Sequence, residues 1–369
     1  MAATFHALMA FGFYCLLLPA DAQPPAGPRP PGPQAAKEPG TPPAPAGPEM
    51  SIEEATRLAV DALDRLESGA DVEDVQPIPA EASRLIELLR VRDPNNPWLA
   101  YLYGRFYALT GRRAEAVEQL RRFVETREGR NEWRAHRLLG DMFVDEYPRL
   151  AEASYQRAAA LNPGEASILF GLSRCLSKLG DTEKAVDLAR RAAAADNRRN
   201  VRYVAHLATL LKGAGRLDEA QAEAESAVAL GRRLMSGTPA SRFALLVAEA
   251  QYGLLIEIMQ LRVGGPAPSA QDYLRLATAI RERGQIAELL TLHEALSVIE
   301  AGVEKTAPNT PPSLLEQYGI TLSDAGRRDK AVSVFEKLLQ ADPNNSVAQT
   351  WLRRLRPEPA EPPGEAPGP

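Results

Sequence analysis

Two stretches of this 369-residue chain, "GRRDKAVSVFEKLLQADPNN" at Gly326–Asn345 and "LAEASYQRAAALNPGEA" at Leu150–Ala166, share one arrangement of residue types. In each stretch an alanine is followed four positions later by an aromatic residue, and a proline closes the segment. Residues four apart lie on one side of an α-helix, and proline cannot continue a helix. The shared arrangement therefore predicts two helices of the same design, far apart in the chain.

The design recurs after glycines that mark turns. In four segments an alanine follows a glycine by five positions, as in "KLGDTEKAVDLA". The first three of these glycines are 69 and 35 residues apart, so a period near 34 or 35 fits with one further unit in the longer interval. The glycines are Gly111, Gly180, Gly215 and Gly326, and the alanines are Ala116, Ala185, Ala220 and Ala331.

A helix–turn–helix pattern with this period resembles the tetratricopeptide repeat. The resemblance covers roughly Met50 to Arg356 and implies an all-α fold, an α-solenoid of antiparallel helix pairs in a right-handed superhelix. The Pro-rich termini have almost no apolar side chains to bury, so we expect them to be disordered. Paired helices must approach closely, so small residues are expected at the crossings, among them Gly104, Gly140 and Gly319. We expect about sixteen helices in total.

The repeat pattern is clear in some segments of the chain and weak in others. The divergent part holds a long apolar segment, "SRFALLVAEAQYGLLIEIMQL", and we expect a changed superhelical angle or an extra helix near Ile286–Val303. The expected divisions are a signal peptide at 1–22, a disordered linker at 23–49, and a helical repeat domain at 50–356 followed by a disordered tail at 357–369. Within the repeat domain we expect a degenerate first unit at 50–95, clear units at 97–235, divergent units at 236–311, a clear unit at 312–345 and a capping helix at 346–356.

The N-terminus is typical of an exported protein. An apolar run at Leu8–Leu18 precedes Ala20-Asp21-Ala22, which predicts cleavage before Gln23 and a periplasmic or secreted location. The alternative is an uncleaved membrane anchor. After cleavage Cys175 is the only cysteine, so no intramolecular disulfide is expected, and no membrane span is expected in the mature chain.

Composition and motifs argue against several functions. The formal net charge of −5 and the absence of basic blocks give no attraction for nucleic acid. His293-Glu294 begins a zinc motif, but Ser297 stands where the second histidine is needed. No nucleophile elbow, phosphate loop or dinucleotide fingerprint is present. We therefore expect no enzyme activity, no metal site and no cofactor.

The family resemblance also implies a binding surface. In such arrays the first helix of each pair lines a concave groove, and the corresponding positions here form a cationic, partly aromatic stripe suited to an extended or C-terminal acidic segment. These positions are Trp98, Tyr101, Arg105, Arg134, Arg137, Asp141, Phe170, Arg174, Lys178, Arg202, His206 and Lys212. The alternative is that these arginines only form the solvated faces of helices.

The sequence thus predicts a protein–protein interaction scaffold or adaptor of the cell envelope, whose partners are other proteins or peptides. The main alternative is a binding subunit for an anionic glycan or polymer that recruits a separate enzyme. A third possibility is a catalytic protein whose site resembles no known motif.

Overall fold

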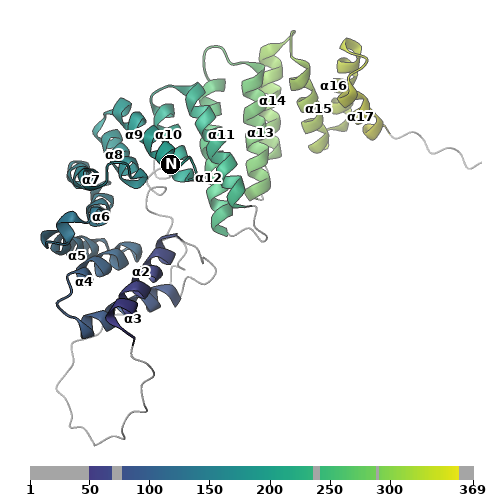
Figure 1. Cartoon of the computed structure of the whole chain (residues 1–369). Helices are drawn as coiled ribbons and strands as arrows, with labels where there is room; N and C mark the ends of the chain where they lie inside the picture. The colour runs from purple at the N-terminus through teal and green to yellow at the C-terminus, as the bar shows by residue number, and fades with distance from the viewer. Residues whose placement is uncertain (1–49, 69–76, 236–241, 288–290, 357–369) are drawn as a thin grey trace, which may run out of the picture. The chain divides into compact units, whose positions relative to one another are not determined.

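The computed structural model describes residues 50–68, 77–235, 242–287 and 291–356, and these ranges contain sixteen α-helices and no β-strand (Figure 1). The predicted all-α solenoid of helix pairs is therefore confirmed for this part of the chain. The predicted signal peptide, linker and tail lie outside the described residues. The helices group into two compact units, Met1–Asn162 and Pro163–Pro369, and each is described by itself.

Unit 1 consists of three helix pairs in which each helix packs against the next along the chain. The first helices of successive pairs, α2, α4 and α6, also contact one another in order. The helices are α2 (Ile52–Ser68), α3 (Pro77–Arg92), α4 (Trp98–Leu109), α5 (Arg113–Glu125), α6 (Trp133–Phe143) and α7 (Pro148–Leu161), with a short 3-10 turn at Gly129–Asn131 between α5 and α6.

Unit 2 contains ten helices, again packed in chain order. They are α8 (Ala166–Leu179), α9 (Thr182–Ala195), α10 (Val201–Gly213), α11 (Leu217–Leu234), α12 (Arg242–Val263), α13 (Ala270–Ala287), α14 (Leu292–Thr306), α15 (Pro312–Asp324), α16 (Arg328–Ala341) and α17 (Ser346–Leu355).

The repeated residues play the parts that the sequence predicts. The four repeat alanines are completely buried, and the four turn glycines adopt left-handed backbone angles, with φ from 72° to 89°. Residues with a side chain rarely adopt these angles, so glycine ends the first helices α4, α8, α10 and α15 without strain.

Helix crossings in both units pair a glycine with a large side chain. A Cβ atom added at Gly140 on α6 would lie 2.8 Å from the ring of Tyr155 on α7, and one at Gly319 on α15 would lie 2.6 Å from Phe335 on α16. In the pair α13–α14 the order is reversed, because Gly302 lies on the second helix and faces Tyr273 on the first. Each crossing therefore depends on one residue without a side chain.

The alternation of first and second helices changes phase within unit 2. α12 lies beside the first helix α10, whereas α13 lies beside the first helix α15. Two consecutive helices thus occupy first-helix places, and α12 has no second helix of its own. A helix is present near the expected extra element, as α14, but the phase changes one helix earlier, between α12 and α13.

Ala244–Val263 of α12 is the one stretch of the described residues that is long and apolar enough to cross a membrane, with a mean hydropathy of 1.3. Length and composition alone are weak evidence, because the core helix of a folded domain passes the same test. This helix packs between α11 and α13 and buries Tyr252, Ile258 and Met259 almost completely. These contacts make α12 a core element of unit 2.

The last helix, α17, lies against the final pair. Ala348 is completely buried, and the ring of Trp351 stacks on Phe335 of α16 at 6.1 Å between ring centroids. α17 therefore shields apolar surface of the pair α15–α16.

Candidate functional site

All twelve predicted binding residues lie on first helices. Unit 1 carries six of them on α4 and α6, and unit 2 carries six on α8 and α10. We call the side of each unit formed by these helices its first-helix face. The surroundings of the two sets differ in charge and exposure, so each face is described in turn.

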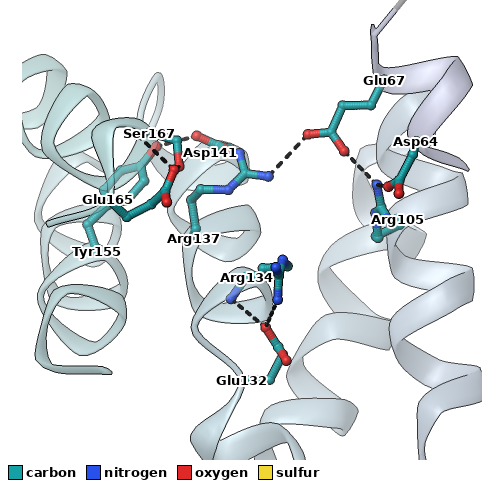
Figure 2. A network of polar contacts seen from close by, with 10 residues as sticks. All are labelled: Asp64, Glu67, Arg105, Glu132, Arg134, Arg137, Asp141, Tyr155, Glu165 and Ser167. Carbon is teal, nitrogen blue, oxygen red and sulfur yellow. Dashed lines mark hydrogen bonds and ion pairs between the residues drawn. The ribbon is translucent and has the colours of Figure 1, made fainter. Parts of the chain in front are cut away.

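In unit 1, α2 supplies carboxylates to the predicted arginines (Figure 2). Arg105 donates hydrogen bonds to Asp64 at 2.8 Å and to Glu67 at 2.6 Å. Arg137 donates to Glu67 at 3.2 Å and to Asp141 at 2.7 Å. The Arg105 and Arg137 side chains are only 7% and 17% exposed. Both arginines are therefore neutralised and covered within the unit.

The two arginines change the acidity of Glu67. Burial acts to raise the pKa of Glu67, but Arg137 and Arg105 outweigh that effect and hold the pKa below its usual value. The hydroxyl of Tyr155 donates to Asp141 at 2.5 Å, which ties the network to α7. The arrangement links four helices of unit 1 and leaves no exposed cationic stripe at Arg105 and Arg137.

The remaining predicted residues of unit 1 form an aromatic cluster and one exposed cation. The rings of Trp98 and Tyr101 meet edge to face at 5.7 Å, and both contact Phe123 of α5. Arg134 lies over the ring of Trp133 at 4.6 Å and pairs with Glu132, the residue that caps α6. Trp98 and Arg134 are thus accessible, at one end of these helices, whereas Tyr101 is buried.

In unit 2, the sequences of α8 and α10 contain no Asp or Glu. They contain four basic residues, Arg174, Lys178, Arg202 and Lys212. Lys212 pairs with Glu257 of α12 at 2.6 Å, so α12 neutralises one of the four. The first-helix face of unit 2 therefore has a local excess of positive charge at α8 and α10.

Phe170 is the centre of an aromatic and cationic cluster on this face. Its ring lies 4.9 Å from that of Tyr203 and 5.1 Å from that of His206. The guanidinium groups of Arg174 and Arg202 approach the same ring at 5.9 and 5.6 Å. Cations are attracted to the negative face of an aromatic ring, so Phe170 helps to hold both guanidinium groups at this place.

The two arginines differ in exposure. Arg174 is 9% exposed, whereas Arg202 lies on the first turn of α10 and is exposed. Arg202 forms no ion pair within 4 Å in the part of the chain that the structure describes. Arg202 is therefore a cation of this face that a partner can reach.

His206 and Ser173 form a partly buried contact between α8 and α10. The Ser173 hydroxyl donates to the carbonyl oxygen of Ala185 at 2.7 Å, so its oxygen accepts from Nε2–H of His206 at 3.0 Å. Burial, with Arg174 nearby, lowers the pKa of His206 to about 3. Ser173 is completely buried, so this pair joins helices and does not present a nucleophile.

Sequence reasoning missed Asp64 and Glu67, because the first unit lacks the turn glycine and alanine that align the others. It also missed Tyr203, although this residue follows Arg202 at the start of a first helix. Among the described residues, no three His, Cys, Asp or Glu side chains come together as a metal site would require.

Comparison with known families identifies the repeats. Models of the tetratricopeptide repeat match residues 97–122, 148–204, 201–226 and 312–345, so the chain contains tetratricopeptide repeats. Three of these matches begin within one residue of the start of a first helix, namely α4, α10 and α15. No curated protein sequence matches the chain.

Several solved structures are similar to parts of the chain. TTC0263, a thermophilic TPR protein of Thermus thermophilus, is 20% identical, with 56% of this chain and 100% of that chain covered and a TM-score of 0.42. PilF of Pseudomonas aeruginosa is 15% identical over 70% of this chain and 97% of that one, with a TM-score of 0.40. MamA of Desulfovibrio magneticus RS-1 is 20% identical over 50% of this chain and 100% of that one, with a TM-score of 0.38.

Proposed function

We propose that this protein is a non-enzymatic protein–protein interaction scaffold that binds an extended acidic peptide segment on the first-helix face of unit 2. Tetratricopeptide repeats typically bind other proteins, and the matching family models describe no catalytic domain. One observation carries the choice of site: α8 and α10 hold four basic residues and no acidic one.

The chemistry of the site favours a carboxylate ligand. An arginine guanidinium can donate two parallel hydrogen bonds to one carboxylate, and Arg202 is exposed while Phe170 holds its position. Phe170 and Tyr203 add flat, rigid apolar surface at little cost in side-chain entropy. Arg105 and Arg137 of unit 1 do not belong to this site, because Asp64, Glu67 and Asp141 already bind them.

Fluorescence anisotropy with a labelled acidic peptide tests the proposal. We expect the intact protein to bind a peptide rich in Asp and Glu more tightly than its Asn and Gln counterpart, and to bind it less tightly as salt increases. Arg202→Ala should weaken binding about five- to tenfold. Arg191→Ala is the matched control, because Arg191 is an exposed arginine of α9, with 58% of its side chain accessible.

Two outcomes would contradict the proposal: equal binding of the acidic and neutral peptides, or unchanged binding by Arg202→Ala. An acidic polysaccharide is the alternative ligand, since exposed cations attract any polyanion. It would be favoured if the polysaccharide competed with the peptide and bound more tightly.

We further propose that the protein is exported and acts in the cell envelope. The support is the sequence pattern of an apolar run followed by Ala20-Asp21-Ala22. Mass spectrometry of protein recovered from the envelope or the medium should find Gln23 as the first residue. Recovery only in the cytoplasm, with the N-terminal segment retained, would contradict export.

A further inference from the structure

Unit 2 contains a hollow of about 400 Å³ where the segment between α9 and α10 meets the last turn of α11. This volume lies at the lower end of the range for ligand pockets, roughly 300 to 1,000 Å³. Its lining combines three apolar side chains, three arginines and Asn197. The apolar residues are Val201, Leu230 and Leu234, and the basic residues are Arg198, Arg199 and Arg233.

Local structure holds the hollow open. The C-terminal end of α11 lines the hollow together with the segment between α9 and α10. That segment turns through two left-handed residues, Asn197 at φ 51° and Arg198 at φ 56°. The amide of Arg198 donates to Ala193 at 2.7 Å, and the carboxylate of Asp196 accepts from the amide of Asn200 at 2.6 Å. These bonds fix the rim.

At the rim, three arginines, Arg198, Arg199 and Arg233, stand against two carboxylates, those of Glu223 and Asp196, which leaves a formal excess of one positive charge. Arg198 pairs with Glu223 of α11, which leaves that pair neutral. Arg199 is exposed and has no ion pair within 4 Å in the ranges that the structure describes. Leu234, beside these arginines, is 51% exposed although it is a leucine. A ligand that complements both the exposed Leu234 and the positive charge of Arg199 has an apolar group with a negative charge close to it.

We propose that this hollow takes an apolar side chain of the acidic peptide that binds at Arg202, an inference that rests on the function proposed above. Val201 lines the hollow and Arg202 belongs to the first-helix face, so consecutive residues of α10 connect the two places. An extended chain advances about 3.3 Å per residue, so an apolar residue a few positions from the carboxylate that binds Arg202 can reach the hollow.

The hollow thus adds sequence selectivity to a charge-based site. The partner segment carries a leucine or phenylalanine near its acidic residues, and a carboxylate beside that residue meets Arg199. An acidic segment without the apolar residue still binds at Arg202, but more weakly.

Binding of two labelled peptides to the full chain tests this inference. One peptide carries a leucine four residues from an Asp–Glu cluster, and the other has serine in place of the leucine. Leu234→Ser removes an apolar wall at an exposed position, so the fold should persist, as far-UV circular dichroism would check. Leu261→Ser on α12 is the matched control, because Leu261 is also 51% exposed.

We expect Leu234→Ser to weaken binding of the leucine peptide about fivefold, to the level of the serine peptide, and Leu261→Ser to leave both affinities unchanged. Arg202→Ala should weaken both peptides. If Leu234→Ser bound both peptides like the intact protein while Arg202→Ala still weakened them, the hollow would have no role and the proposed function would stand. If Arg202→Ala also had no effect, both would be wrong.

Discussion

At the residue scale, Glu67 shows how one side chain can decide the character of a surface. Its carboxylate accepts from Arg105 of the neighbouring helix and from Arg137, 70 positions later in the chain. Arg105 and Arg137, which the sequence placed on a cationic binding surface, therefore belong to an internal network of ion pairs. Their role in unit 1 is to join helices.

Replacing Glu67 by glutamine tests that role. We expect Glu67→Gln to lower the free energy of unfolding by about 1–2 kcal/mol at pH 7, because two covered arginines each lose a charged acceptor but keep Asp64 or Asp141. Urea unfolding followed by circular dichroism measures the change. Glu118→Gln, which breaks an exposed pair with Arg122, should cost about 0.5 kcal/mol or less.

The same variant should show a characteristic pH dependence. The pKa of Glu67 is lowered in the folded chain, so its stabilisation is complete above the ordinary glutamate pKa and is lost as the pH falls through the folded value. The difference in stability between the intact protein and Glu67→Gln should therefore shrink on acidification. A constant difference down to pH 3 would show that the charge of Glu67 does not matter.

His206 gives a second test. Its pKa of about 3 keeps it neutral in the folded chain, whereas the unfolded chain binds a proton below about 6.5. Stability should therefore fall as the pH drops from 6.5 toward 3. Glutamine can still donate to Ser173 but does not titrate, so His206→Gln should flatten the pH profile of the unfolding free energy over this range. An unchanged slope would contradict a buried neutral histidine.

The sequence located the candidate residues but not their partners. All twelve lie on first helices, because the repeat period fixes which positions share a side of each helix. Whether a cation is open or paired depends on contacts between helices far apart in sequence. The carboxylates of α2 come from a unit without the repeat signature, so no pattern could align them with Arg105.

At the scale of elements, the crossings of paired helices are the most constrained points. Gly140 lies against Tyr155, which is completely buried and hydrogen-bonded through its hydroxyl, so the ring cannot move aside. Gly253, in the middle of α12, has no atom within 4 Å of its hypothetical Cβ. The same substitution should therefore have opposite effects at the two sites.

We expect Gly140→Ala to destabilise the protein by about 1–3 kcal/mol through overpacking. Gly253→Ala should stabilise it by about 0.5–1 kcal/mol, because alanine loses less backbone entropy in a helix. Thermal or urea unfolding of the two variants in parallel gives both values. Similar effects of the two substitutions would argue against the close crossing at Gly140.

The phase change near α12 was harder to anticipate. The length of α12 and the weak pattern after it could be read from the sequence, since no alanine follows Gly284 at the usual distance. The periodicity of apolar residues shows which side of a helix is buried, but not which other helix covers that side. The neighbours here are set by packing between α10, α12, α13 and α15.

At the scale of the whole molecule, the proposed binding site lies within one unit. The ring and cation contacts of Phe170, Arg202 and His206 described above all involve residues of unit 2. Residues 163–356 produced alone should therefore remain helical and bind the acidic peptide within about twofold of the full chain. A folded fragment that failed to bind would show that unit 1 contributes to the site.

The reversed crossing of α13 and α14 limits how such an array can be rearranged. If α14 were exchanged for α16, Phe335 would meet Tyr273, and if α16 were exchanged for α14, Gly302 would meet Gly319 across an empty space. A collision or a void would follow, and either is costly in a densely packed interior. Helix pairs on either side of α13–α14 can therefore be duplicated, lost or exchanged as whole pairs. A single helix of α13–α14 cannot be combined with a single helix of another pair.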